Sequence, residues 1–198
     1  MIYLTKLGEE EICKKSIVTL GKFDGLHRGH RQLFKRLSIM KESMGDECQT
    51  VAFTFDRKLL KWKFGEQFKC ILDEKERRDL IKELGVDVLV ECPFDEKIRS
   101  MEAEDFIKDI LIDLFHAKCI VIGKDFRFGY ERKGDYYLLC KLSDKYGYEV
   151  SLIDEVFEDG ERISSTRIRE EIAKGNLLKA NELLGYPFCV EGEILHGK

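Results

Sequence analysis

Residues 16–30 read SIVTLGKFDGLHRGH, and this stretch decides the fold. Its first five residues are mostly apolar or β-branched, which predicts a short buried strand. Gly21 and Gly25 then allow a tight turn. The residues that follow, RGHRQLFKRLSIMKESM, place Leu33 and Leu37 at helical spacing and end before a glycine, which predicts a helix. The stretch therefore predicts a strand, a glycine-rich turn and a helix in direct succession.

The same alternation recurs along the rest of the chain. Apolar, β-rich runs at 49–55, 86–91, 118–123 and 148–156 predict four further strands. Helical spacing or composition predicts five further helices, at 73–84, 101–115, 135–147, 165–175 and 176–185. We therefore expect an α/β fold: a Rossmann-like, open, parallel five-stranded sheet with helices on both faces.

The composition favours a protein that binds a small molecule. The chain has 198 residues and a formal net charge of −4, with charges of both signs mixed along it, so the sequence predicts no surface for a nucleic acid or an anionic membrane. The seven cysteines form no C-x-x-C pair, and the N-terminus has no apolar signal segment. We therefore expect a cytoplasmic protein without membrane spans. The sequence does not indicate its oligomeric state.

Four of the predicted strands lead into segments rich in glycine, hydroxyl, carboxylate and cationic residues. These segments are GKFDGLHRGH, TFDRK, GKDFRFGYERKGD and, after a turn EDGER, ISSTRIR. Open α/β sheets bind their ligands in the crevice beyond the carboxyl ends of the strands. We therefore expect the four segments to converge on one ligand site.

The residue types in these segments indicate a phosphate ligand. His27 and His30 flank a predicted helix start, and each can donate a hydrogen bond to a phosphoryl oxygen. ISSTRIR supplies three hydroxyl groups at a second helix start, together with Arg167 and Arg169, and both kinds of group suit a polyphosphate. The chain has neither a G-x-x-x-x-G-K-[ST] loop nor a G-x-G-x-x-G motif, which excludes P-loop chemistry and gives no sign of a dinucleotide cofactor.

Each pattern also has a simpler interpretation. His27 and His30 could form a two-histidine metal site, although no carboxylate or cysteine at ligand spacing completes it. ISSTRIR could be a helix cap followed by a solvated basic turn. Phe126 could belong to the core rather than to a ligand platform, whereas the neighbours of Phe128 favour a loop.

The motifs resemble those of a known family. GKFDGLHRGH is similar to the G-x-F-D-G-x-H-x-G-H motif of the nucleotidylyltransferase superfamily, and ISSTRIR resembles its I-S-S-T-x-I-R signature. Three further stretches, VIGKDFRFGYERKGD, LDEKERRDLIKELGVD and ANELLGYPFCVEGEILHGK, narrow the resemblance. They are similar to the adenylyltransferase module of the bacterial bifunctional riboflavin kinase/FMN adenylyltransferases, the prokaryotic FAD synthetases. The resemblance runs from Ile17 to the C-terminus.

The resemblance implies an enzyme that transfers AMP from ATP to FMN with Mg²⁺, giving FAD and pyrophosphate; the metal ligands are not indicated. It implies catalytic roles for His27, His30 and Arg167. The positions that match the nucleotide and phosphate segments are Gly21, Phe23, Asp24, Gly25, Gly29, Ser164, Ser165 and Thr166. Those assigned to the flavin side are Asp125, Phe126, Phe128 and Gly129, with Arg57 and Lys58 available for a substrate phosphate by charge.

Two departures from the family pattern bear on substrate and domain organisation. FDRKLL stands where the family usually has F-x-P-H-P, so the acceptor could be another small phosphate, such as phosphopantetheine, nicotinamide mononucleotide or glycerol phosphate, in an adenylyl- or cytidylyltransferase. A catalytically silent nucleotide- or flavin-binding regulator is the alternative outside enzymes. We also expect residues 1–186 to form the adenylyltransferase domain, and 187–198 to be the start of an otherwise absent riboflavin kinase-like domain.

Overall fold

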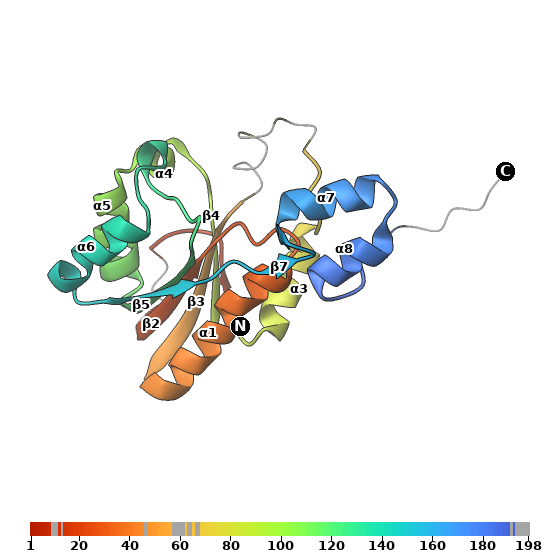
Figure 1. The fold of residues 1–198 in the computed structure, drawn as a ribbon. Coiled ribbons are helices and arrows are strands. Elements are labelled where there is room, and N and C mark those ends of the chain that lie inside the picture. Colours follow the sequence, from red (N-terminus) through yellow and green to blue (C-terminus); the bar gives the residue numbers. More distant parts are fainter. Residues whose placement is uncertain are drawn as a thin grey trace.

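The computed structural model describes residues 1–8, 12, 14–45, 47–56, 62, 65, 68–190 and 192. Within them, six strands form one parallel sheet in the order β1-β4-β3-β2-β5-β6 (Figure 1). All five predicted strands are present, so the parallel α/β fold is confirmed. The strands are β1 Ile2–Leu4, β2 Lys15–Leu20, β3 Cys48–Phe55, β4 Val88–Cys92, β5 Ala117–Gly123 and β6 Glu149–Ile153.

The edge strand β1 is a sixth strand, which corrects the predicted number of five. It has three residues and pairs in parallel with β4, with Ile2 opposite Val88. A run of three residues is too short to show the alternation of a strand. Its extended conformation therefore depends on pairing with the edge of β4, and the sequence alone did not predict it.

Helices cover both faces of the sheet. Figure 1 shows α5 and α6 on one side, and α1 and α3 on the other. The predicted helix at 101–115 is divided into a short α-helix and a π-helical stretch, in which the N–H of Phe115 donates to the carbonyl of Ile110 five residues back. The helices are α1 Arg28–Met44, α3 Glu74–Glu83, α4 Glu96–Ser100, α5 Ala103–Asp105, the π-helix η1 Phe106–Leu114, the 3₁₀ turn η2 Tyr130–Arg132, α6 Tyr136–Tyr146, α7 Ser165–Ala173 and α8 Leu177–Leu184.

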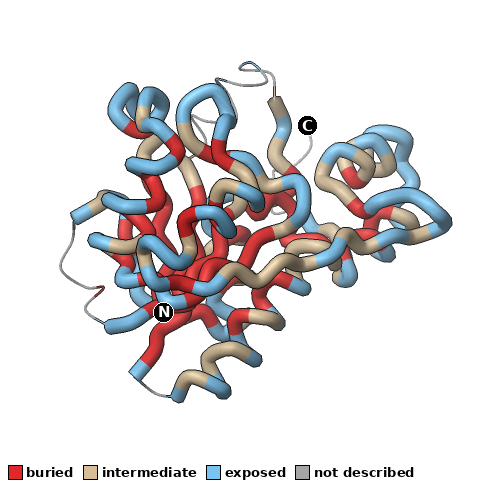
Figure 2. The backbone as a smooth tube through the Cα atoms, turned by 60° about the vertical axis from the view of Figure 1, so that its left-hand side comes forward, coloured by how far each residue is buried: buried red, intermediate tan, exposed pale blue. Residues whose placement is uncertain are grey.

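The hydrophobic core lies on both sides of the central strands. Along β2, Ile17 packs with α1 on one face, whereas Val18 packs with η1 and α6 on the other, because successive side chains of a strand point to opposite faces. Figure 2 shows the buried residues gathered on the strands and on the inner faces of the helices. The central strands are therefore buried on both faces, as expected for a parallel sheet.

The order of the strands defines where a ligand can bind. From β2 the chain moves to β3 and β4 on one side, and then returns to β5 and β6 on the other. The strand order therefore reverses between β2 and β5, and open α/β sheets bind ligands at such a point, beyond the carboxyl ends of the strands. The segments 21–27 and 124–135, which the sequence analysis singled out, leave the sheet at this point.

Candidate active site

The two histidines of the first motif lie at the N-terminus of α1. His27 is the N-cap residue of this helix, and its Nδ1 accepts a hydrogen bond of 3.3 Å from the backbone N–H of His30. The two imidazole rings are stacked, with their centroids 3.7 Å apart. His27 is buried and His30 is partly buried. The pair is therefore held as one unit beside the free N–H groups of the helix terminus.

Burial keeps both imidazoles neutral near pH 7. It lowers the pKa of His27 to about 4, with a further contribution from the charge of Arg162. Burial, and then the neighbouring His27, hold the pKa of His30 well below its usual range. Because Nδ1 of His27 accepts a hydrogen bond, its proton resides on Nε2. Nδ1 of His30 is buried and has no hydrogen-bond partner among the described residues, and a buried polar atom of this kind calls for a ligand or a water.

The turn between β2 and α1 is packed too closely for larger side chains. Gly25 has φ +83°, and a Cβ there would lie 2.9 Å from Cδ1 of Ile71. A Cβ on Gly29 would lie 3.2 Å from the ring of His27, and one on Gly21 would lie 2.6 Å from the ring of Phe23. These three glycines therefore allow the loop to fold tightly around the histidines.

Phe23, which the sequence predicts among the nucleotide-binding residues, has a fully buried side chain. Its ring meets that of His30 edge-on at 5.6 Å and lies 5.0 Å from that of Phe34. Phe23 therefore supports the ring of His30, and its own contact with the nucleotide stays a prediction.

Asp24 joins three segments of the chain. Its Oδ1 accepts a hydrogen bond of 2.9 Å from the N–H of Ile71, and its Oδ2 lies 2.6 Å from Nη2 of Arg169. Its backbone carbonyl accepts a bond of 2.7 Å from the hydroxyl of Ser165. The carboxyl group was expected to bind the nucleotide, but it is buried and both of its oxygens are occupied. Asp24 therefore fixes the β2 loop to α7.

The second motif forms the N-terminus of α7, as predicted. Ser164 is the N-cap residue, and its hydroxyl accepts a hydrogen bond from the N–H of Arg167. Thr166 is exposed in the first turn. Because Ser165 bonds to Asp24, the N-termini of α1 and α7 are held beside each other. The structure thus brings the two predicted phosphate segments together.

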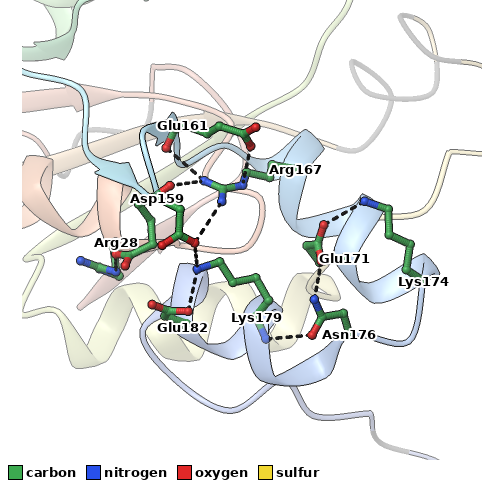
Figure 3. A network of polar contacts seen from close by, with 10 residues as sticks. Arg28, Asp159, Glu161, Arg167, Glu171, Lys174, Asn176, Lys179 and Glu182 are labelled. Atoms are coloured by element: carbon green, nitrogen blue, oxygen red, sulfur yellow. Dashed lines mark hydrogen bonds and ion pairs between the residues drawn. The ribbon is translucent and has the colours of Figure 1, made fainter.

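The two arginines of this motif have different partners. The guanidinium of Arg167 donates to the carbonyls of Glu158 and Glu161, at 2.9 and 3.0 Å, in the hairpin formed by β7 (Phe157–Glu158) and β8 (Glu161–Arg162) (Figure 3). Arg169, which occupies the arginine position of I-S-S-T-x-I-R, is bound to Asp24. The sequence analysis named Arg169 as a group that suits a polyphosphate, but it assigned the catalytic role to Arg167 alone. A direct phosphate contact by Arg167 stays a prediction.

The loop after β5 contributes the predicted flavin-side residues. Asp125 is exposed and lies 2.9 Å from a guanidinium nitrogen of Arg162, a residue that no sequence signal identified. Phe126 is partly buried and stacks on Phe128 at 5.6 Å. Phe128 lies in the loop, as predicted, but its side chain is buried and packs against Phe106, whereas Phe126 packs against the core and stays partly exposed.

Gly129 has φ +70°, and a Cβ there would lie 2.6 Å from Cα of Ala103. The backbone of Gly129 therefore lies directly against Ala103 at the start of α5.

Arg57 and Lys58 lie outside the described residues. Within the described part of the chain, no group of three or more His, Cys, Asp or Glu side chains is arranged to hold a metal ion, and no helix there is long and apolar enough to cross a membrane.

Comparison with solved structures supports the fold. A crystal structure of a protein from Streptococcus pneumoniae, described as a macrolide-efflux protein, matches with a TM-score of 0.82 and 31% identity, over 100% of this chain and 66% of that chain. Pantothenate synthetase from Thermus thermophilus matches with a TM-score of 0.55 and 18% identity, over 93% and 81% of the two chains. The second likeness concerns the fold alone.

Comparison with known sequences identifies the family. The bifunctional riboflavin kinase/FMN adenylyltransferase of Escherichia coli is 35% identical over 182 residues, which are 91% of this chain and 58% of that protein. The protein of the same description from Listeria monocytogenes is 31% identical over 183 residues, 91% of this chain and 57% of that protein. The chain thus spans less than two thirds of the length of these relatives. The family model for FAD synthetase matches residues 9–167, and the chain belongs to the FAD synthetase family.

Proposed function

We propose that this protein transfers the AMP group of ATP to the phosphate of FMN, producing FAD and pyrophosphate, within residues 1–186. The observation that carries the proposal is the histidine pair at the N-terminus of α1, where His30 Nδ1 is buried without a partner among the described residues. A helix N-terminus attracts anions, and two neutral imidazoles beside it add hydrogen-bonding groups without the repulsion between two fixed charges.

In the proposed reaction, a phosphate oxygen of FMN attacks the α-phosphorus of ATP in line. The new P–O bond forms as the bond to the bridging oxygen of the β-phosphate breaks, and the electron pair leaves with pyrophosphate. No general base is required, because a phosphate monoester is already ionised near neutral pH. Catalysis then depends on positioning and on stabilising the charge that develops on the α-phosphate.

The histidines act on this developing charge. His27 carries its proton on Nε2, since its Nδ1 is occupied by the N–H of His30. The N–H of His27 can therefore donate to a non-bridging oxygen of the α-phosphate. A phosphate nearby favours the charged form of an imidazole, so the hydrogen bond strengthens as negative charge accumulates in the transition state. The ring of Phe23 packs edge-on against the ring of His30 and limits its movement.

The leaving pyrophosphate would lie at the N-terminus of α7. The helix offers free N–H groups and the hydroxyl of Thr166, which is exposed. Arg169 lies on the same helix and reaches Asp24 in the β2 loop, which places a guanidinium beside the β2 loop. We assign Arg169 to the phosphate site on this ground. Arg167 is held by the hairpin carbonyls of Glu158 and Glu161, and we keep it as a second predicted contact to the pyrophosphate.

The residues of the site fit a Mg²⁺ ion that is bound through the nucleotide. Asp24 is committed to Arg169 and to backbone N–H groups, and Asp125 is the exposed carboxylate of the β5 loop. In proteins Mg²⁺ commonly binds to substrate phosphates and waters with one or two carboxylates. The ion supplies charge neutralisation on the phosphates.

The acceptor is assigned to FMN on two grounds: the family match and the partly exposed aromatic ring of Phe126 beside Asp125. The loop after β3 departs from the family pattern, so other small phosphates are the competing acceptors. We place the reaction in the cytoplasm, consistent with the buried cysteines, Cys48, Cys92 and Cys119, which form no disulfide.

One set of incubations tests the proposal. ATP and Mg²⁺ are supplied with FMN, riboflavin, phosphopantetheine, nicotinamide mononucleotide or glycerol phosphate, and pyrophosphate and FAD are measured by a coupled assay and by chromatography. We expect FAD and pyrophosphate in equal amounts with FMN, and no adenylylation of riboflavin, because riboflavin has no phosphate nucleophile. Pyrophosphate released with another acceptor but not with FMN would reassign the substrate. Nucleotide binding without any pyrophosphate would identify a silent regulator.

A further inference from the structure

The β7–β8 hairpin lies directly before α7 and carries a cluster of carboxylates. Its turn is formed by Asp159 with φ +55° and Gly160 with φ +78°, which is the pair of left-handed residues that a two-residue hairpin turn requires. This turn places Glu158 directly opposite Glu161 in the antiparallel pair. Two like charges at opposed positions destabilise a hairpin, so this arrangement depends on cations from elsewhere.

Each glutamate meets an arginine from a different helix. Glu158 forms an ion pair with Arg28, the first residue of α1, and Glu161 lies 3.3 Å from Nε of Arg167 on α7. Figure 3 shows Asp159 and Glu161 of the hairpin beside Arg167, with Lys179 of α8 bound to Asp159. The hairpin is therefore held by ion pairs to three helices that border the proposed phosphate site.

Arg28 is unusual in its position. It follows His27 in the chain and occupies the first turn of α1, in which there is no acidic residue. The helix dipole disfavours a cation at a helix N-terminus. The presence of Arg28 there therefore indicates that its guanidinium binds an anion. Its side chain is 37% exposed. It lies at the same helix terminus as His30, whose buried Nδ1 has no partner among the described residues, and such an atom calls for a ligand or a water at this terminus.

We propose that Arg28 is a further phosphate-binding residue of the site, and that in the free protein the carboxylate of Glu158 occupies the position on its guanidinium that a phosphate oxygen of the nucleotide takes. This inference rests on the proposed nucleotide site. Polyphosphate binding then exchanges one anionic partner of Arg28 for another. Glu158, left opposite Glu161, then loses its ion pair with Arg28 and keeps only the weaker effect of the Lys179 charge.

A purely structural role for the ion pair predicts a different outcome. If Arg28 only anchors the hairpin, Arg28→Gln and Glu158→Gln break the same contact and must change ligand affinity in the same direction. If Arg28 binds phosphate and Glu158 competes for it, the two substitutions must change the affinity in opposite directions. The sign of the two effects therefore separates the two roles.

The experiment measures the dissociation constant for inorganic pyrophosphate by titration calorimetry at low, constant ionic strength. We expect Arg28→Gln to raise the dissociation constant about ten-fold, the effect of losing one charge-assisted hydrogen bond. We expect Glu158→Gln to lower it about three-fold, since an exposed ion pair is weak. Thermal unfolding of both variants provides the check on folding. Arg28→Gln should lose more stability than Glu158→Gln, because it leaves Glu158 opposite Glu161 without this cation, whereas Glu158→Gln also removes the repulsion between the two carboxylates.

The matched controls are Lys174→Gln and Glu171→Gln. These residues form an ion pair of 2.9 Å elsewhere in the α7–α8 network (Figure 3), and the substitutions make the same changes in net charge. Both controls should alter the dissociation constant less than two-fold. Shifts of the same sign in Arg28→Gln and Glu158→Gln, or shifts no larger than those of the controls, would overturn the inference.

The failure of this inference can be separated from that of the proposed function. FAD formation by the unaltered protein is measured in parallel. FAD formation without opposite shifts in pyrophosphate affinity rejects only the role of Arg28. Opposite shifts without FAD formation leave the phosphate site in place and reject the assigned reaction.

Discussion

Acidification should destabilise this protein through His27. The folded state holds this histidine neutral, with a pKa of about 4, whereas a histidine in an unfolded chain titrates near 6.5. Between these two values the unfolded chain binds more protons, so stability is fully present above pH 6.5 and falls as the pH decreases towards 4. For a group this well buried, the two pKa values give a loss of about 2 kcal/mol between pH 7 and pH 5.

Urea unfolding followed by circular dichroism at pH 7 and pH 5 measures this loss. The control is His27→Asn, because an asparagine at the N-cap can also accept the hydrogen bond from the N–H of His30 but does not titrate. Carboxylates contribute to both proteins and cancel in the comparison, as does the part of the His30 contribution that comes from its own burial rather than from His27. The pH-dependent loss should be about 2 kcal/mol larger in the unaltered protein. If the two proteins differ by less than about 0.5 kcal/mol in this loss, the argument that burial keeps His27 neutral in the folded protein is refuted.

Four substitutions test the other parts of the site. His30→Ala should lower kcat by about 10²–10³ with little change in ATP affinity, because its contact strengthens only in the transition state; a near-normal kcat in steady-state assays removes it from the mechanism. Arg169→Ala should cost about 2–3 kcal/mol in urea unfolding, since Asp24 is left buried without its cation, and a loss under about 1 kcal/mol would contradict this pairing. Gly25→Ala should cost about 2–4 kcal/mol, from the left-handed φ and the contact with a neighbouring side chain; unfolding at the normal urea concentration would show that the loop relaxes. Arg167→Ala should raise KM for ATP about ten-fold, with partial recovery in Arg167→Lys, and an unchanged KM would limit this residue to holding the hairpin.

Much of the fold was predictable because its elements carry local signals. The helix α3 begins with a capping box, in which the side chains of Asp73 and Glu76 each bond to the other's backbone N–H, and α6 begins at Asp135 and ends before Gly147. These signals depend only on residues that lie close together in the sequence. The strand β1 and the hairpin β7–β8 carry none of comparable length, because each strand has only two or three residues and is defined by its pairing partner.

The helix N-termini that carry the candidate site were predictable from the sequence, but which of their side chains are buried or bound by other residues of the chain was not. The histidine motif and ISSTRIR could be placed at helix N-termini from their sequence, and the structure brings these termini together. By contrast, the carboxylate of Asp24 accepts hydrogen bonds from Ile71 and Arg169, which are 47 and 145 residues away in the chain. Contacts of this range leave no local pattern. The same holds for Phe23, whose burial depends on its packing beside α1.

The electrostatic arrangement of the free site explains how one surface can both fold and bind a polyanion. The stacked imidazoles are 3.7 Å apart, and two positive charges at that distance repel strongly, so the pair folds in its neutral form. The positive charge of the site is instead carried by arginines that form ion pairs with carboxylates of the chain, such as Arg28 with Glu158 and Arg169 with Asp24. An incoming triphosphate would then act in two ways. It would replace the partly exposed carboxylate of Glu158 on Arg28, and its own charge would raise the pKa of the imidazoles that it meets. Because the second effect grows with the negative charge on the α-phosphate, the proposed site would bind the transition state more tightly than the substrate, which is the condition for lowering the barrier.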